Sequence, residues 1–240
     1  MTNGATKVDG KMEIEIKQKP IRTYVIRGGR ITDAQKKAFD RWWPEYGLSL
    51  HDGIIDNSIF ANNNPLILEI GFGMGDSLLQ MAASTPGNNF IGIEVHPPGV
   101  GRLLNNAGKA RLHNLKVYMA DAVDVLQDCI PDDSLERLQL FFPDPWHKKK
   151  HHKRRIVQPP FAQLVCRKLI SGKTFHVATD WHDYAEYMME VLTLSKGLRN
   201  AVAEYQYSPP PGYRPRTKFE ARGERLGHGV WDLVFKKEAS

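Results

Sequence analysis

Four acidic side chains stand at or just beyond the ends of short apolar runs that have the length of β-strands. They are Glu94, Asp121, Asp144 and Asp180. Ligands of open α/β sheets bind outside the carboxyl ends of the strands, so these carboxylates are candidates for one shared site. A carboxylate offers only hydrogen-bond acceptors, which suits Glu94 to a vicinal diol such as that of a ribose. An exposed acid at the end of a strand is the alternative for Glu94.

Asp121 fits two roles that are compatible with each other. Its carboxylate can accept a hydrogen bond from an adenine amino group. It also precedes a segment with the pattern of a helix, residues 123–129, and aspartate is a favoured N-cap residue. The sequence therefore predicts a ligand contact, a helix cap or both at this position.

Asp144 lies within the run Pro143-Asp144-Pro145-Trp146. Proline on both sides restricts the backbone, which favours a rigidly held carboxylate. Trp146 offers a flat face on which an extruded base can stack. The run therefore predicts a carboxylate and an aromatic platform at one strand end.

A strongly basic octapeptide, residues 148–155, follows at once. It holds six of the 33 Lys and Arg residues and no acid, and the net charge of the whole chain is +6. Lys and Arg clusters attract phosphates, so the sequence predicts a nucleic-acid-binding patch here. A solvated charge run beside a core tryptophan is the alternative. The residues assigned to this patch are Lys149, Lys150, Lys153, Arg154 and Arg155.

Charge elsewhere is distributed unevenly. Residues 17–41 contain eight Lys and Arg against two acids, whereas residues 42–147 contain five Lys and Arg against thirteen acids. An acidic central region flanked by basic segments indicates two kinds of partner. The basic segments suit a polyanion, and the acidic pocket suits a cationic or hydroxyl-rich ligand.

Three glycines at alternate positions follow the first apolar run, in the pattern Glu69-x-Gly71-x-Gly73-x-Gly75. Glycine serves where the backbone needs a positive φ or must approach a ligand closely. The dinucleotide fingerprint G-x-G-x-x-G would need its third glycine at position 76, where Asp76 stands. The pattern instead resembles motif I of the class I S-adenosylmethionine (AdoMet) methyltransferases. An ordinary tight turn between a strand and a helix is the alternative.

Alternating apolar runs and helical patterns position these residues in an α/β sheet. Residues 1–19 are polar and are predicted to be a disordered tail, and residues 20–240 to form a single domain with a basic N-terminal arm. A capping box at Thr32 predicts a helix that Pro44 and Gly47 end. The strands are expected at residues 66–70, 89–96, 114–118, 138–142, 174–180 and 230–235. The other helices are expected at residues 77–83, 98–109, 161–169 and 181–194.

Length and composition are those of an ordinary globular protein. The chain has 240 residues, of which 41% are hydrophobic and 25% charged. No apolar run approaches the roughly 20 residues of a membrane helix, and the first ten residues lack the apolar core of a signal peptide. Cys129 and Cys166 lie in apolar-patterned segments, which favours core packing in a reducing cytoplasm over a disulfide or a metal site.

Several motifs together resemble the bacterial tRNA (guanine-N7-)-methyltransferase family. The run of residues 141–148, Phe-Phe-Pro-Asp-Pro-Trp-His-Lys, followed by residues 153–158, is the most specific of them. Matching segments occur in the same order along residues 20–237. They are residues 69–75, 94–96, 178–181, 217–220 and 227–233.

The resemblance implies a Rossmann-like class I methyltransferase fold: a mostly parallel seven-stranded sheet with one antiparallel late strand and helices on both faces. It implies methyl transfer from AdoMet, which leaves S-adenosylhomocysteine, to N7 of the guanine at position 46 in the variable loop of tRNA. It implies no metal, a cytoplasmic location and no obligate protein partner, with a monomer favoured over a homodimer. The residues it assigns to AdoMet are Glu69, Glu94, Asp121 and Asp144, with Gly71, Gly73 and Gly75 forming the turn. Those it assigns to the substrate are Lys148, Asp180, Thr217, Lys218, Phe219 and Glu220, with Asp144 as the catalytic residue.

The chemistry of this reaction limits what Asp144 has to do. Guanine N7 carries a lone pair and no proton, so attack on the methyl group requires no general base. The methylated ring becomes cationic, so we expect Asp144 to orient the base and stabilise that charge. Asp180 and Glu220 can accept hydrogen bonds from guanine N1–H and its exocyclic amine, which would exclude adenine.

Two other classes of function are weighed against this one. A non-catalytic RNA-binding protein on the same fold would have no reason to place four carboxylates near phosphates. A small-molecule dehydrogenase is disfavoured by Asp76 and by the basic segments.

Overall fold

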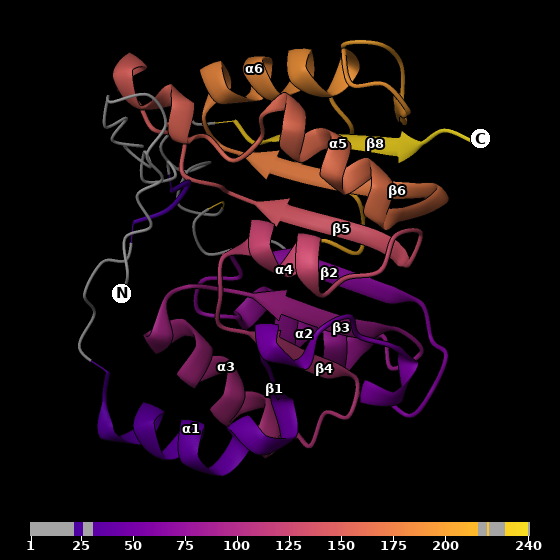
Figure 1. Cartoon of the computed structure of the whole chain (residues 1–240). Helices are drawn as coiled ribbons and strands as arrows, with labels where there is room; N and C mark the ends of the chain where they lie inside the picture. Colours follow the sequence, from indigo (N-terminus) through magenta and orange to yellow (C-terminus); the bar gives the residue numbers. More distant parts are fainter. Residues whose placement is uncertain (1–21, 26–30, 216–219, 221–228, 240) are drawn as a thin grey trace, which may run out of the picture.

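One mixed sheet organises the chain in the computed structural model, which describes residues 22–25, 31–215, 220 and 229–239. Its eight strands lie in the order β1-β4-β3-β2-β5-β6-β8-β7 (Figure 1). The strands are β1 (Gly47–Leu48), β2 (Leu66–Ile70), β3 (Asn89–Ile93), β4 (Leu115–Tyr118), β5 (Leu135–Phe141), β6 (Leu169–Thr179), β7 (Leu198–Asn200) and β8 (Trp231–Lys237). The helices are α1 (Asp33–Tyr46), α2 (Asp76–Ser84), α3 (Pro97–Ala110), α4 (Ala122–Asp128), α5 (Pro159–Lys168) and α6 (His182–Thr193), with short 3-10 helices η1 (Leu50–Asp52), η2 (Asn57–Ile59) and η3 (Lys149–Arg154).

The strand directions confirm the predicted class I methyltransferase fold. Neighbouring strands pair in parallel from β1 to β6, and β8 is inserted antiparallel between β6 and β7. The predicted number of seven strands is wrong by one. The additional strand, β1, has only two residues and pairs with β4 as the chain leaves α1. So short a pairing has no hydrophobic pattern by which it could be recognised.

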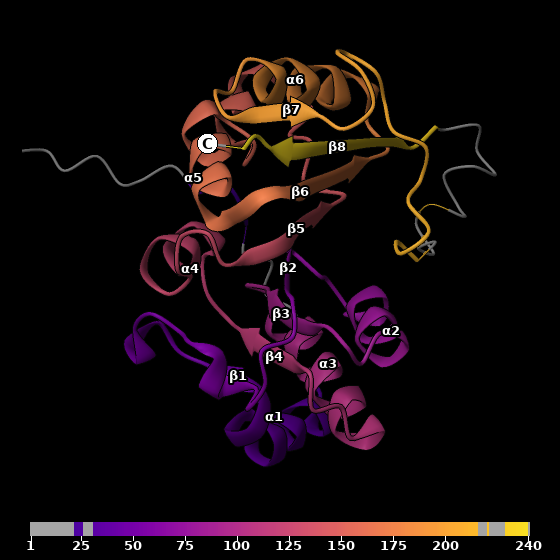
Figure 2. The same cartoon turned by 90° about the vertical axis from the view of Figure 1, so that its right-hand side faces the viewer.

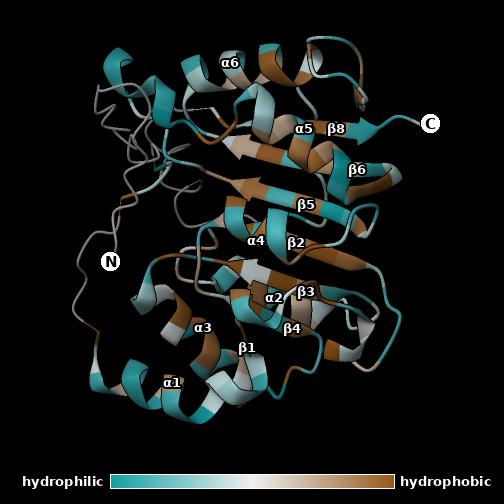
Figure 3. Cartoon of the chain, viewed as in Figure 1, coloured by the Kyte–Doolittle hydropathy of each residue, from teal (hydrophilic) through white to brown (hydrophobic). Residues whose placement is uncertain are grey.

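Helices cover both faces of the sheet, as predicted (Figure 2). Side chains alternate along β2, so Leu68 and Ile70 face α4, α5 and α6, whereas Ile67 faces α1, α2 and α3. Figure 3 shows the result, since the central strands are coloured mostly hydrophobic and α1 at the lower edge mostly hydrophilic. Because helices bury both faces of the sheet, a site is expected at the polar ends of its strands.

Helix α1 extends further than its sequence suggested. The capping box at Thr32 is present, but Pro44 lies inside the helix, which ends at Tyr46 rather than before the proline. Tyr46 is buried, and its hydroxyl donates a hydrogen bond to the Ala107 carbonyl of α3 at 3.3 Å. Packing against α3 therefore holds the last turn despite the proline, which has no N–H to donate.

No helix in the described part of the chain could cross a membrane. None of these helices combines the length and the apolar character that crossing a bilayer requires.

Candidate active site at the carboxyl edge

A pocket of about 390 Å³ opens at the carboxyl ends of the central strands. The segments that follow β2, β3, β4 and β5 line it, together with residues 23–25 of the N-terminal arm. This is where the acids at the strand ends were expected to converge. Its lining includes Gly71, Glu94, Ala120, Ala122, Leu140, Asp144 and Ile156.

The glycine turn has the backbone geometry that its spacing predicted. Gly71, Gly73 and Gly75 have φ values of 73°, 58° and 78°, all in the left-handed region that favours glycine. A Cβ atom at Gly71 would meet nothing within 4 Å. The turn is therefore open on its pocket side, where a ligand can approach the backbone.

Glu94 ties the end of β3 to this turn. Its Oε2 accepts a hydrogen bond from the Gly73 N–H at 2.8 Å. Its Oε1 accepts from the N–H groups of Val95 and His96 at 2.7 and 3.0 Å. Because Glu94 is buried and lines the pocket, the alternative of a solvent-facing acid is wrong.

Asp121 caps α4. Its Oδ1 accepts a hydrogen bond from the Val123 N–H at 2.9 Å, which confirms the capping role. Its neighbours Ala120 and Ala122 line the pocket wall. A contact between Asp121 and adenine stays a prediction.

Glu69 lies beneath the pocket rather than in its lining. The residue is 3% exposed, and its Oε2 has no hydrogen-bond partner among the described residues. Burial raises the pKa of the Glu69 carboxyl to about 8, with Glu94 adding to the rise and Arg137 opposing it. Burial therefore favours the protonated, neutral form of this carboxyl.

We expect Glu69→Gln to change how stability depends on pH. The pKa of Glu69 in the folded protein lies above the value of about 4.3 expected in the unfolded chain. The contribution of this carboxyl to the free energy of unfolding is therefore greatest below about pH 4.3, and it declines as the pH rises to about 8. The wild-type protein should lose on the order of a few kcal/mol of unfolding free energy relative to Glu69→Gln between pH 5 and 9. Urea unfolding at several pH values measures this, with the exposed Glu186→Gln as control. Parallel pH profiles for wild type and Glu69→Gln would refute it.

Asp144 stands at the pocket rim in a constrained loop. Its Oδ1 accepts a hydrogen bond from the Trp146 N–H at 3.1 Å. Phe142 and Trp146, on either side of the proline-bracketed carboxylate, have left-handed φ values of 53° and 49°. Bulky residues in this region cost about 1–2 kcal/mol each, so the surrounding structure must hold the loop in place. The Phe142 N–H does so in part, by donating to the Ala178 carbonyl of β6 at 2.7 Å.

The prediction that Trp146 offers a free face to a base is wrong. Trp146 is buried, and its indole N–H donates to the Thr23 carbonyl at 3.3 Å. The Arg154 guanidinium lies 4.2 Å over the same ring. Trp181 is the exposed aromatic side chain here: it is 39% exposed, with the His147 ring packed against it at a centroid distance of 4.2 Å.

The basic octapeptide divides into two groups. Lys149, Lys150 and Lys153 are exposed on η3. Arg155, predicted to belong to the RNA-binding patch, is buried: its Nε donates to the Pro145 carbonyl at 3.0 Å and its guanidinium pairs with Asp183. Arg154 binds the arm through the Arg22 carbonyl at 3.0 Å. Arg155 is therefore too buried to face a phosphate, whereas Arg154 ties η3 to the arm, and its contact with RNA stays a prediction.

The expected substrate residues are only partly described. Lys148 and Asp180 are exposed beyond the ends of β5 and β6. Thr217, Lys218 and Phe219 lie outside the described residues. Glu220 is buried, and Arg214 donates to both of its carboxylate oxygens at 2.7 Å.

Arg214 connects this segment to the sheet through a second carboxylate. Its Nε and Nη2 donate to Asp232 of β8 at 2.8 and 3.0 Å. His176 lies 2.7 Å from Asp232 through Nε2 and 3.0 Å from the Tyr213 hydroxyl through Nδ1. Burial lowers the pKa of His176, so the neutral ring donates to Asp232 and accepts from Tyr213. Spacing along the sequence does not indicate this network, because His176 and Asp232 lie on strands that are distant in the chain from Arg214.

A family match and two solved structures identify the chain as a methyltransferase by its fold. Residues 63–233 match the model of a family described as "Putative methyltransferase". The 16S rRNA methyltransferase KamB has a TM-score of 0.54 at 17% identity, covering 89% of this chain and 97% of its own. The antibiotic-resistance methyltransferase Kmr has a TM-score of 0.52 at 15% identity, covering 80% and 94%. At such identities the structures show the fold alone, which is that of a class I methyltransferase.

Closer relatives define the family. A tRNA (guanine-N(7)-)-methyltransferase of Saccharophagus degradans is 62% identical, over 94% of this chain and 99% of its own length. Proteins of the same name from Ectopseudomonas mendocina and Alcanivorax borkumensis are 54% and 56% identical over 92% and 91% of this chain, and 93% and 92% of their own. The chain belongs to the tRNA (guanine-N(7)-)-methyltransferase family.

Proposed function

We propose that this protein transfers the methyl group of AdoMet to N7 of the guanine at position 46 in the variable loop of tRNA, acting in the cytoplasm as a monomer. Family membership supports the donor and the reaction class. The observation that carries the proposal is the position of Asp144. Asp144 is exposed, lines a cofactor-sized pocket and follows β5 within three residues. A base presented from the basic rim would meet the donor there.

The residues of the pocket fit AdoMet. The Oε2 of Glu94 accepts one backbone hydrogen bond and keeps acceptor capacity for a ribose hydroxyl. Ala120, Leu140 and Ile156 provide apolar walls for a flat base. Gly71 leaves space beside its backbone for the methionine portion. When bound, AdoMet supplies an electrophilic methyl group on a sulfonium.

The residues at the rim then have positioning and electrostatic roles. Asp144 orients guanine so that the N7 lone pair faces the methyl group, and its negative charge stabilises the cationic ring that forms. Asp180 accepts from the N1–H and the exocyclic amine, groups that adenine does not present in this arrangement. Lys148 and the exposed lysines of η3 bind the phosphates beside the target nucleotide.

Trp181 is the side chain we expect to stack on a base at this site. It directly follows Asp180 and is exposed, and His147 holds the ring edge-on. Base–aromatic stacking contributes about 1–3 kcal/mol, so Trp181→Ala should raise the KM for tRNA about tenfold or more. Trp181→Phe should keep most of the affinity. Steady-state kinetics with tRNA as the varied substrate measures this, and an alanine variant with wild-type KM would assign Trp181 to packing alone.

Transfer of labelled methyl from AdoMet to an unmodified tRNA transcript tests the function. We expect label in 7-methylguanosine after digestion, and no label when guanine 46 is replaced. Label in another nucleoside would refute the assigned atom. No label, with AdoMet and tRNA each still bound, would favour a non-catalytic RNA-binding protein.

A further inference from the structure

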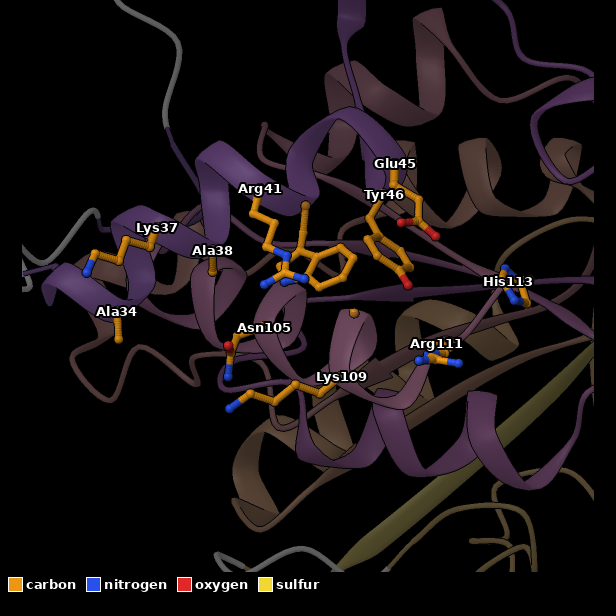
Figure 4. Close-up of a pocket in the computed structure, with 12 residues that line it drawn as sticks. Ala34, Lys37, Ala38, Arg41, Glu45, Tyr46, Asn105, Lys109, Arg111 and His113 are labelled. Carbon is orange, nitrogen blue, oxygen red and sulfur yellow. The ribbon is translucent and has the colours of Figure 1, made fainter.

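A basic groove lies between α1 and α3, apart from the pocket that holds Asp144 (Figure 4). Its volume is about 550 Å³. Lys37 and Arg41 line it from α1, and Lys109 and Arg111 line it from the end of α3. Glu45 is the one carboxylate in its lining, so positive charge dominates. Two of these cations come from the acid-rich central part of the sequence.

Close packing of the two helices forms the floor of the groove. Gly108 of α3 faces the Trp42 ring so closely that a Cβ atom there would lie 2.3 Å from it. Arg41 places its guanidinium 4.6 Å over the same ring, which fixes the side chain and leaves its N–H donors available. The groove is therefore a built feature of the fold, with a rigid aromatic base and cationic walls.

Ion pairs within the protein and the helix dipoles do not account for the clustering of these four cations. All four cations are exposed, and none forms an ion pair within the described part of the chain. Lys109 and Arg111 gain from the negative end of the α3 dipole, but Lys37 lies towards the positive end of α1. Arg111 also adopts a left-handed φ of 50°, at a helix end where glycine is usual. Among the described residues, Glu45 therefore offsets only part of the positive charge of this cluster.

The groove runs away from the methylation pocket. Gln35, near the start of α1, donates to the Pro98 carbonyl at the start of α3 at 2.8 Å, and Tyr46 at the end of α1 donates to the Ala107 carbonyl near the end of α3. The two helices therefore run side by side in the same direction. Because α3 follows β3, both begin at the carboxyl edge of the sheet. The eleven residue steps from Ala34 to Glu45 span about 17 Å at 1.5 Å per residue. In Figure 4, Lys37 and His113 lie towards opposite ends of the lining.

We propose that this groove binds the phosphodiester backbone of the tRNA substrate, as a second contact outside the active site. The inference rests on the proposed function for its choice of RNA as the polyanion. Contacts to the backbone carry no sequence information, so the groove adds affinity and orientation without choosing the methylated base. The target loop is then held at one edge of the protein while the remaining RNA lies along α1 and α3.

Salt-dependent binding of an unmodified tRNA transcript tests the proposal. The variant is Lys37→Gln, Lys109→Gln and Arg111→Gln together, which leaves the stacked Arg41 in place. We expect its Kd to rise at least about tenfold and the slope of log K against log salt to become shallower by about 2. The kcat at saturating tRNA should not change. A short RNA stem–loop that carries the target guanine but cannot reach the groove should bind both proteins equally.

A second triple variant, Arg167→Gln, Lys196→Gln and Arg199→Gln, is the matched control because it removes the same charge at exposed residues of α5, of β7 and of the turn before β7. Equal losses in the two variants would mean that net charge alone acts, which overturns the proposal. So would unchanged tRNA binding in the groove variant, or an equal loss for the short stem–loop. Because binding is measured without methyl transfer, a protein that binds tRNA through the groove but transfers no methyl group would refute only the proposed function.

Discussion

Replacing Asp144 with asparagine should lower kcat by about 10²- to 10³-fold, the usual effect of removing one preorganised electrostatic contact. Asparagine has the same shape and can still accept the hydrogen bond from the Trp146 N–H, so the loop should keep its geometry. What is lost is the negative charge beside the forming cationic ring. AdoMet affinity should also fall, because Asp144 lines the cofactor pocket.

The form of the pH–rate profile separates the two roles open to Asp144. If it only positions guanine and stabilises charge, kcat should show no titration near neutrality, because N7 has no proton to lose. Asp144→Glu, which keeps the charge but moves it, should recover part of the activity. Asp128→Asn controls for net charge, since Asp128 is exposed at the end of α4. A titration near neutrality that disappears in Asp144→Asn would instead make Asp144 a general base.

Replacing Arg214 with methionine should lower the unfolding free energy by about 3–5 kcal/mol, since it removes the guanidinium that pairs with two buried carboxylates. The side chains of Arg214, Glu220 and Asp232 are only 2%, 8% and 2% exposed. For a chain of this length the loss corresponds to a melting temperature lower by roughly 10 °C. The tRNA KM should rise as well, because Arg214 anchors the segment that contains Glu220.

The destabilisation by Arg214→Met should depend on pH. As pH falls, the two carboxylates that have lost Arg214 can take up protons, so the difference from wild type should shrink towards acid and be largest at neutral pH and above. Removing their charges as well, with Glu220→Gln and Asp232→Asn, should recover part of the stability but not the tRNA KM. Thermal and urea unfolding measure the effect, with the exposed Arg167→Met as control. A variant as stable as wild type at pH 7 would mean that another group satisfies both carboxylates.

Local patterns in the sequence predicted the parts of the site that depend on neighbouring residues. Gly71, Gly73 and Gly75 were expected to allow positive φ values or a close approach to a ligand, and all three have positive φ values. Glu94 was expected where β3 ends, and it lines the pocket there. Thr32 and Asp121 were recognised as helix caps because a cap bonds to an N–H only two or three residues away.

The exposure of aromatic and cationic side chains could not be predicted in this way. Trp146 and Trp181 both follow strands, yet the N-terminal arm and Arg154 cover the first and leave the second exposed. Lys153 and Arg155 are two residues apart, but only Arg155 meets Asp183 of α6. Burial depends on which distant segment folds over a residue, and residue type and spacing do not record that.

The sequence by itself determined the class of fold, the turn geometry and the acids at the strand ends, because these follow from backbone preferences and from periodicity within about ten residues. Only the tertiary structure decided which charges are paired and which are free. Arg214 meets Asp232 across 18 positions, and Lys37 shares a groove with Lys109 on another helix. Such pairings depend on how helices and strands pack, and that packing is settled by the burial of the whole core.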